Sequence, residues 1–461
     1  MIINPYIFRE YDIRGIAEED LRDESVWHIG KAIASYIIKR GGKTISLGRD
    51  ARISSPRIHD VVLDAFLKSG VNVIDIGMVP TPLLYFSVFH FGLDGGVQIT
   101  GSHNPKEFNG IKIMCGKETI YGKEIQKIKE IIERGEYVEG HGKKWIREDV
   151  IFEYIREIKE RVRLWDPENY EVAVDPGNGT CGPVIEELYR ELKIKFTGIY
   201  MEPNGHFPNH LPDPTVEKYM EDLKNLMKKE NRFTCGFGFD GDGDRLGVID
   251  DKFRIIYGDK ILAILSKKVL EEKKGSKIIF DVKSSQGVYE YIKSLGGDPI
   301  IWKTGHSLIK AKLKEENAPI AGEMSGHLFF KDRFYGFDDA IYASLRFLEV
   351  VDTFRKKVSE LVDEIPFYYS TPEIRVECPD EHKFKVVEKL KKKFSKKFKI
   401  LDIDGVRINF PDGFGLVRAS NTQPVLVLRF EGKTPEKMEE IKNIILEELS
   451  KFSEVNLGSI P

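Results

Sequence analysis

Thr44-Ile-Ser-Leu-Gly-Arg-Asp50 opens a pattern that recurs three times along this chain. A β-branched run ends in aspartate, a polar or glycine-containing turn follows, and a helical stretch leads to another apolar run. The second copy begins with Val172-Ala-Val-Asp175 and the third with Ile278-Ile-Phe-Asp281. Alternating strand and helix signals are typical of α/β units. The sequence therefore predicts three related α/β domains with mixed sheets.

The pattern changes after Pro366. Short strand-like runs, a lysine-rich helical stretch at 383–397 and an amphipathic helix at 435–449 predict a separate α+β domain. A chain of 461 residues is long enough for roughly three to four domains. We expect the divisions to be 1–150, 151–253, 254–366 and 367–461.

Composition excludes several classes of protein. Lys and Arg total 71 against 74 for Asp and Glu, so no global basic field favours nucleic acid as a partner. The four cysteines form no C-x-x-C pair, which argues against a zinc site or a disulfide framework. The N-terminal residues lack the apolar region of a signal peptide, and no apolar stretch reaches transmembrane length. We expect a cytoplasmic protein with no membrane partner.

Asp240-Gly-Asp-Gly-Asp-Arg245 places three carboxylates at alternate positions between two apolar runs. Glycines between them let the oxygens turn toward one hard cation, and Mg²⁺ suits a site that leaves coordination positions for a phosphate. A calcium EF-hand is the nearest rival, but its loop needs Gly at position six and Glu at position twelve, where this chain has Arg245 and Asp251. A solvated acidic turn is the other alternative.

Thr100-Gly-Ser-His-Asn-Pro105 lies between two strand-like segments, so Ser102 sits in a tight loop. Gly101 permits close backbone approach, and His103 and Lys112 are placed to steady charge near the hydroxyl of a serine nucleophile. Taken alone, the same residues also describe an ordinary turn.

Two further loops look suited to oxyanions. They are Gly322-Glu-Met-Ser-Gly-His327 and Arg418-Ala-Ser-Asn-Thr-Gln-Pro424. An arginine beside hydroxyl and amide donors offers forked, charge-assisted hydrogen bonds to a phosphate. Capped turns are the alternative for each loop taken singly.

Gly177-Asn-Gly-Thr-Cys-Gly182 fits the G-x-G-x-x-G dinucleotide pattern, with Glu202 about twenty residues further on. Prolines bracket this loop, and the first and third repeats have no such fingerprint. The motif is therefore interpreted as the turn of the second repeat rather than a dinucleotide site.

Taken together, these segments resemble the α-D-phosphohexomutase superfamily, specifically its phosphomannomutase/phosphoglucomutase group, over essentially the whole chain. The resemblance implies three α/β domains and a C-terminal domain similar to the TATA-box-binding-protein fold, around a central cleft. It implies that Ser102 is phosphorylated, and that Ser102 completes the shell of Mg²⁺ ligands formed by Asp240, Asp242 and Asp244.

The resemblance also assigns the remaining site residues. Around the transferring phosphoryl group it implies catalytic roles for His103, Lys112, Arg245, Lys283 and His306. It implies that substrate contacts Tyr11, Arg14, Lys303, the sugar-binding residues Glu323, Ser325 and His327, and the phosphate-binding residues Arg418, Ser420, Asn421 and Thr422.

The implied reaction is reversible interconversion of hexose 1-phosphate and hexose 6-phosphate, with a hexose 1,6-bisphosphate as intermediate and activator. A lysine or a histidine near the accepting hydroxyl is the expected general base, and the sequence leaves that choice open. Met324 resembles the glucose and mannose phosphate enzymes, whereas glucosamine phosphate mutases typically have Gln there. A metal-dependent phosphatase and a non-catalytic phosphosugar-binding protein are the alternatives from other classes.

Overall fold

The first domain is built on the first repeat, as the sequence predicts. The computed structural model of this chain describes residues 3–420 and 423–459. Strand Thr44–Arg49 pairs in parallel with strand Asn72–Met78, and the helix Ser55–Lys68 connects the two strands. The domain contains β1 (Ile13–Ile16), β2 (Thr44–Arg49), β3 (Asn72–Met78), β4 (Gly95–Ile99), β5 (Phe108–Cys115), β6 (Glu118–Thr119), β7 (Lys144–Ile146), α1 (Asp23–Ile38), α2 (Ser55–Lys68), α3 (Thr81–His90), α4 (Lys123–Arg134) and the 3-10 turn η1 (Pro5–Ile7).

The second domain repeats this plan after α5 (Val150–Arg161), which leads out of the first domain. Its elements are β8 (Glu171–Asp175), β9 (Lys195–Gly198), β10 (Cys235–Phe239), β11 (Leu246–Ile249), β12 (Ile255–Ile256), α6 (Cys181–Glu191), α7 (Glu221–Glu230) and the turns η2 (Pro167–Asn169) and η3 (Glu217–Met220). β12 follows the expected division at residue 253 but pairs with β11. The second sheet therefore extends a few residues into the segment expected to form the third domain.

The third domain has the smallest sheet and the most helices. Its elements are β13 (Lys277–Asp281), β14 (Asp298–Trp302), β15 (Ile320–Gly322), β16 (Leu328–Phe330), α8 (Gly258–Glu272), α9 (Gln286–Ser294), α10 (His306–Glu315), α11 (Ala340–Phe354) and α12 (Val358–Asp363).

All three α/β domains share one strand order. It is β5-β4-β2-β3 in the first, β11-β10-β8-β9 in the second and β16-β15-β13-β14 in the third. In each domain, the fourth of these strands in sequence order (β5, β11 or β16) runs antiparallel to its neighbour, and the other three strands are parallel to one another. The loops that carry Ser102, the three aspartates and Glu323 each join the third strand to the fourth. The three predicted functional loops therefore occupy equivalent positions, at the carboxyl ends of strands where α/β proteins bind ligands.

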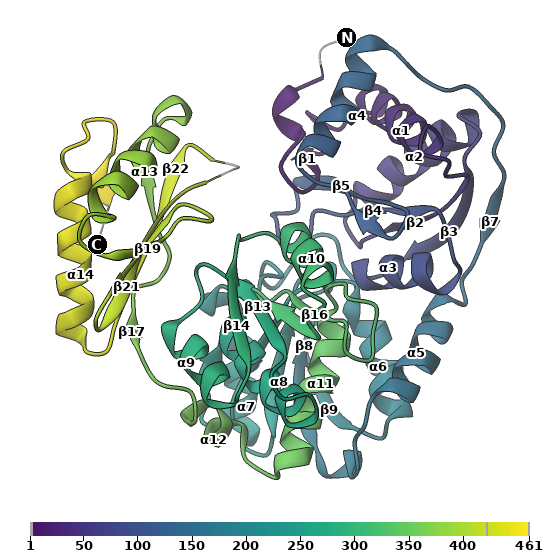
Figure 1. Ribbon diagram of the computed structural model, residues 1–461. Coiled ribbons are helices and arrows are strands. Elements are labelled where there is room, and N and C mark those ends of the chain that lie inside the picture. Colours follow the sequence, from purple (N-terminus) through teal and green to yellow (C-terminus); the bar gives the residue numbers. More distant parts are fainter. Residues whose placement is uncertain (1–2, 421–422, 460–461) are drawn as a thin grey trace.

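The C-terminal domain is an α+β unit, as the sequence predicts. Its elements are β17 (Tyr369–Ser370), β18 (Ile374–Glu377), β19 (Lys399–Leu401), β20 (Val406–Phe410), β21 (Gly413–Ala419), β22 (Val425–Gly432), α13 (Asp380–Phe394), α14 (Pro435–Leu449) and the turn η4 (Leu457–Ser459). A Cβ on Gly415 would meet Ile445 of α14, whereas Phe414 and Leu416 pack with Val282 of the third domain. The sheet thus faces α14 on its outer side and the third domain on its inner side (Figure 1).

The three largest apolar clusters among the described residues show which domains are packed together. The first and C-terminal domains each have a core of their own. The second and third domains share one core, which also takes in α3, and residues 340–352 of α11 are all buried within it. The second and third domains therefore form a single packed body. Within the described residues, no helix has the length and apolar character needed to cross a bilayer.

Asp339 is a buried residue that hydrogen-bonds to both α11 and α5. Its titration therefore allows the stability of this shared core to be tested. It caps α11 by accepting from the Tyr342 amide at 2.9 Å and accepts from the Tyr154 hydroxyl at 2.8 Å. Burial raises the pKa of Asp339 to about 7. The folded chain therefore keeps a proton that the unfolded chain releases above about pH 4.

We expect this stabilisation to be complete below about pH 4 and to be lost as the pH rises toward 7. The Tm of the wild type should therefore fall, relative to that of Asp339→Asn, between about pH 4 and pH 7, because the amide does not titrate. Differential scanning calorimetry at several pH values measures this difference, and parallel Tm profiles would contradict it.

Candidate active site

Ser102 is held in an unusual backbone conformation at the end of β4. Its φ is +50°, in the left-handed region that costs a non-glycine residue about 1–2 kcal/mol. Its amide donates to Thr100 Oγ1 at 2.9 Å, and its hydroxyl donates to Asp240 Oδ2 at 2.7 Å and lies 3.2 Å from His103 Nδ1. The loop therefore aims Ser102 Oγ from the first domain at the acidic loop of the second.

The three aspartates lie in a tight turn between the antiparallel strands β10 and β11. All three are buried, and each offers an oxygen within 4.8 Å of the others. The Asp240 carboxylate also accepts from the amides of Asp244 and Arg245, at 3.0 and 3.1 Å. Strands rather than helices flank this loop, so the structure does not form the EF-hand alternative.

Charge in this loop is balanced by Lys112 of β5. Its ammonium donates to Asp242 Oδ2 at 2.7 Å and to Asp244. Burial, with the neighbouring carboxylates, raises the pKa of Asp240 well above its usual value. Burial acts the same way on Asp242 and Asp244 and is the largest single influence, but Lys112 together with Thr81 at Asp242 and with His327 and Arg245 at Asp244 outweighs it, so both pKa values lie below the usual range.

These carboxylates suit a divalent metal ion. Asp242 Oδ1 is buried and has no hydrogen-bond partner in the part of the chain that is described. An unpaired buried carboxylate oxygen is costly unless a cation or donor meets it. Together with the oxygens of Asp240 and Asp244, it forms the all-oxygen set that Mg²⁺ prefers.

The third domain contributes two histidines of opposite character. His327 lies between Asp244 and Glu323, 3.3 Å from each, and although burial opposes it these carboxylates raise its pKa to about 9. His306 stacks on His327 with ring centroids 5.4 Å apart. Burial, with Lys310 nearby, holds the pKa of His306 well below its usual value. At neutral pH one ring is cationic and the other is neutral.

A cleft of about 870 Å³ lies in front of these residues and receives side chains from all four domains. Of the predicted site residues, it is lined by Tyr11, His103, Arg245, Lys283, His306, Glu323, Ser325, His327, Arg418 and Ser420. Ser102, Lys112 and the three aspartates are buried behind this lining. Arg14 donates to Asn104 Oδ1 of the serine loop at 3.1 Å.

Four predicted substrate contacts are not placed at the cleft, and one of them is Arg14, which is described but is not among the lining residues. Lys303 is exposed and is not among the described residues that line it. Asn421 and Thr422 lie outside the described residues. The roles predicted for these four residues, like those predicted for the other site residues, stay predictions.

Several residues that support the site were not found by sequence reasoning. Thr81 Oγ1 donates to Asp242 at 2.5 Å, and Asp338 Oδ2 lies 3.6 Å from His306 Nδ1. Asp404 accepts from Arg418 Nε at 2.7 Å and from the Thr304 amide at 3.0 Å. Each contact joins residues far apart in the sequence or in different loops, so no local motif marks it.

The glycines of the dinucleotide-like loop are explained by protein packing. A Cβ on Gly179 would meet the Gly241 carbonyl oxygen at 2.7 Å, and one on Gly182 would meet that of Met201 at 1.8 Å. Asn178 donates to the Glu202 carbonyl at 2.8 Å. The loop packs against the acidic loop and the 201–202 backbone, so its glycines need no pyrophosphate to account for them.

A serine hydroxyl directed at a buried acidic loop, beside a cleft that four domains share, is the arrangement expected of an enzyme that transfers phosphoryl groups. Known families agree with this class. Models for the phosphoglucomutase/phosphomannomutase family match residues 5–139 (α/β/α domain I), 152–253 (domain II), 257–369 (domain III) and 373–448 (C-terminal domain).

Relatives match over nearly the full chain. A phosphomannomutase/phosphoglucomutase of Pseudomonas aeruginosa is 41% identical over 96% of this chain and 95% of its own. A phosphoglucomutase of Neisseria gonorrhoeae is 42% identical over 95% of each chain. A crystal structure of a family protein from Burkholderia thailandensis has a TM-score of 0.92 and 37% identity, over 98% of both chains. The chain belongs to the phosphoglucomutase/phosphomannomutase family of the α-D-phosphohexomutase superfamily.

We expect Asp242→Asn to weaken Mg²⁺ binding by more than about tenfold. Mutation of a residue that only hydrogen-bonds to a metal ligand already lowers metal affinity by about tenfold or more, and Asp242 is a proposed ligand itself. The amide removes a charge from the acidic loop and one of its carboxylate oxygens. Isothermal titration of the dephosphorylated protein with Mg²⁺ measures the affinity. Asp412→Asn, in the turn between β20 and β21, is the matched control, and equal affinities for the two variants would contradict the assignment.

Proposed function

We propose that this chain is a phosphohexomutase that interconverts hexose 1-phosphates and hexose 6-phosphates through phosphorylated Ser102. The observation that carries the proposal is the 2.7 Å hydrogen bond from Ser102 Oγ to Asp240, made inside the acidic loop at one wall of the cleft. Relatives named phosphomannomutase/phosphoglucomutase, about 40% identical over nearly the whole chain, support the same activity. Small hexose phosphates are the proposed partners, and the cytoplasm is the proposed location.

Asp240, Asp242 and Asp244 would hold Mg²⁺, with phosphorylated Ser102 beside them. The ion supplies neutralisation of the phosphoryl charge when it is bound. The Lys112 ammonium donates to the Asp242 carboxylate, and Arg245 extends from the acidic loop into the cleft. These cations place positive charge around the transferring group without any covalent activation of the serine.

The second phosphate of the sugar would bind at Arg418 and Ser420 on the C-terminal wall of the cleft. Glu323 and Ser325 would contact the sugar between the two phosphate sites. The phosphoserine donates its phosphoryl group to the free hydroxyl of a hexose phosphate, and the resulting 1,6-bisphosphate turns end for end and returns its other phosphate to Ser102. A phosphatase would need no second phosphate site, so the Arg418 loop favours the mutase.

Among the candidates for general base, the geometry favours His306 over Lys112. The Lys112 ammonium is engaged by two carboxylates, which hold it as a cation. His306 lines the cleft, is neutral, and presents Nδ1 to Asp338 at 3.6 Å. A carboxylate facing Nδ1 favours the tautomer in which Nε2 keeps its lone pair, as a proton acceptor requires.

The substrate proposed is glucose or mannose phosphate rather than an amino-sugar phosphate. Met324 lines the cleft in the sugar-binding loop, where glucosamine phosphate mutases typically have Gln. An apolar side chain there offers no hydrogen bond to a polar substituent at carbon 2.

Ser102→Ala should abolish turnover of glucose 1-phosphate and mannose 1-phosphate, because no residue is then left to carry the phosphoryl group. A loss of at least about 10³-fold in kcat is expected, since removing a nucleophilic serine from other enzymes costs that much or more, and it is measured with Mg²⁺ and trace glucose 1,6-bisphosphate. Ser276→Ala, on an exposed turn, should keep wild-type activity. Release of inorganic phosphate by the wild type, or full turnover by Ser102→Ala, would sink the mutase proposal.

His306→Gln should lower kcat by roughly 10²–10⁴-fold with little change in KM, the usual loss on removing a general base. Because the pKa of His306 is depressed, wild-type kcat should not lose this base until the pH falls well below 6.5. Profiles of kcat against pH for the wild type, His306→Gln and the control His382→Gln measure both effects. Unchanged kcat in His306→Gln would assign the proton to another group.

A further inference from the structure

Arg52 is a buried residue whose guanidinium lies directly beneath the Ser102 loop. Its side chain is 0% exposed. Nη1 donates to the carbonyl oxygens of Pro105 and Phe108 at 2.6 and 2.9 Å, and Nη2 donates to those of Ser102 and Asn104 at 2.7 and 2.6 Å. One side chain therefore binds three carbonyl groups of the loop that carries the proposed nucleophile, and a fourth at the first residue of β5.

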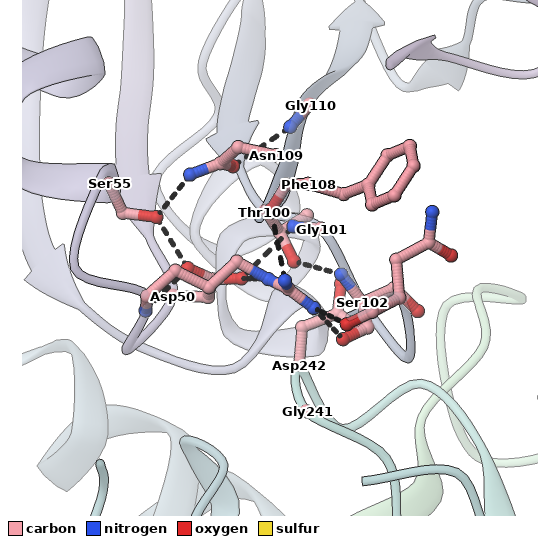
Figure 2. Close-up of polar contacts among 12 residues, drawn as sticks. Asp50, Ser55, Thr100, Gly101, Ser102, Phe108, Asn109, Gly110, Gly241 and Asp242 are labelled. Carbon is pink, nitrogen blue, oxygen red and sulfur yellow. Dashed lines mark hydrogen bonds and ion pairs between the residues drawn. The ribbon is translucent and has the colours of Figure 1, made fainter. Parts of the chain in front are cut away.

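Asp50, the aspartate that ends the first repeat strand, holds this guanidinium in place. Its Oδ2 accepts from Arg52 Nε at 3.2 Å and from the Gly101 amide at 3.1 Å. Its Oδ1 accepts from Ser55 Oγ at 2.5 Å, and Asn109 donates to Ser55 in turn at 2.9 Å. Figure 2 shows Asp50, Ser55 and Asn109 on one side of the loop, with Ser102 beside Gly241 and Asp242 on the other.

The guanidinium also has two close neighbours besides its hydrogen-bond partners. A Cβ on Gly101 would lie 2.4 Å from Arg52 Nε, so glycine is the residue that leaves room for it. The Phe207 ring of the second domain also packs against the guanidinium, with its centroid 5.1 Å from Arg52 Cζ. Arg52 therefore has little freedom to move once the first two domains are packed together.

This arrangement explains how the loop keeps its conformation. Four carbonyl oxygens that point at one place repel each other, and buried carbonyls need donors. A guanidinium supplies five donors in a planar fork, whereas an ammonium supplies three from a single point. Arg52 fixes the carbonyl that follows the Ser102 Cα, while Thr100 Oγ1 holds the Ser102 amide that precedes it, so both peptides around this positive-φ residue are restrained.

We propose that Arg52 is a positioning residue for phosphoryl transfer, because it holds the Ser102 loop in the conformation that aims Ser102 Oγ at the acidic loop. The role in transfer rests on the proposed function, whereas the hold on the loop does not. Arg52 itself is behind the loop and touches no substrate in this arrangement.

The test is Arg52→Lys, which keeps the charge but loses the fork. Displacements near 1 Å at a reacting group cost roughly 10²-fold, so kcat should fall by at least about tenfold while KM changes less than about threefold. Phosphorylation of Ser102 by glucose 1,6-bisphosphate should be slower by a similar factor. Intact-mass measurements during the incubation follow the phosphorylated fraction with time. Amide hydrogen exchange in residues 100–110 should become faster.

Arg57→Lys is the matched control. Arg57 also donates to loop carbonyls of the first domain, those of Leu21 and Ala17, each at 3.0 Å, but it does not contact the Ser102 loop. Faster exchange at 100–110 with reduced kcat in Arg52→Lys alone would support the proposal. Wild-type exchange or wild-type kcat in folded Arg52→Lys would overturn it, as would equal effects in both variants.

Gly101→Ala decides the matter if Arg52→Lys does not fold, because its Cβ displaces the guanidinium without removing it. The same loss of kcat at nearly constant KM is expected, and wild-type kcat would overturn the proposal. A wild type that exchanges slowly at 100–110 but lacks mutase turnover would refute the proposed function. In that outcome, the exchange difference between Arg52→Lys and Arg57→Lys still decides whether Arg52 holds the loop.

Discussion

Three carboxylates buried side by side form the constraint on which the rest of this structure depends. Ions removed from water are tolerated only where opposite charge and hydrogen bonds replace the solvent. The cations come from different domains: Lys112 from the first, Arg245 from the acidic loop itself and His327 from the third. Neutralising the acidic loop therefore brings three domains to one point, and the site is at the same time an interface between them.

Repetition of one supersecondary plan makes this convergence possible. Because the strand order is the same three times, the loop between the third and fourth strands always leaves the carboxyl edge of its sheet. Strand-end aspartates anchor two of these loops, since Asp50 accepts from the Gly101 amide and Asp281 from the Met324 amide. The shared core around α11 then fixes the acidic loop and the sugar-binding loop relative to each other, and Arg245 and His327 form a β-bridge between them.

The C-terminal domain is attached in a different way. Its core is separate, and polar contacts make much of its junction with the third domain. Arg407 donates to the carbonyls of Val282 and Ser284, while Glu431 accepts from Ser285 and Gln286. Arg418, which lines the cleft, donates to the Asp404 carboxylate. The same carboxylate also accepts from the Thr304 amide of the third domain. The two proposed phosphate sites thus sit on parts of the chain with separate cores, and both border the cleft of about 870 Å³.

The sequence by itself determined the three α/β repeats, the α+β domain, and the serine and aspartate loops, because each depends on residues close together in the chain. Strand periodicity, turn glycines and alternating aspartates are local signals, and they were sufficient to put Ser102 and Asp240 in loops between strands, whereas the roles of these residues came from the family resemblance. The tertiary structure alone decided that Arg52 binds the serine loop, that Asp338 faces His306, that Asp404 orients Arg418, and that Lys303 stays exposed. These outcomes depend on packing between segments with no common motif, since a hydrogen bond between distant loops is set by how the domains meet and leaves no spacing in the sequence.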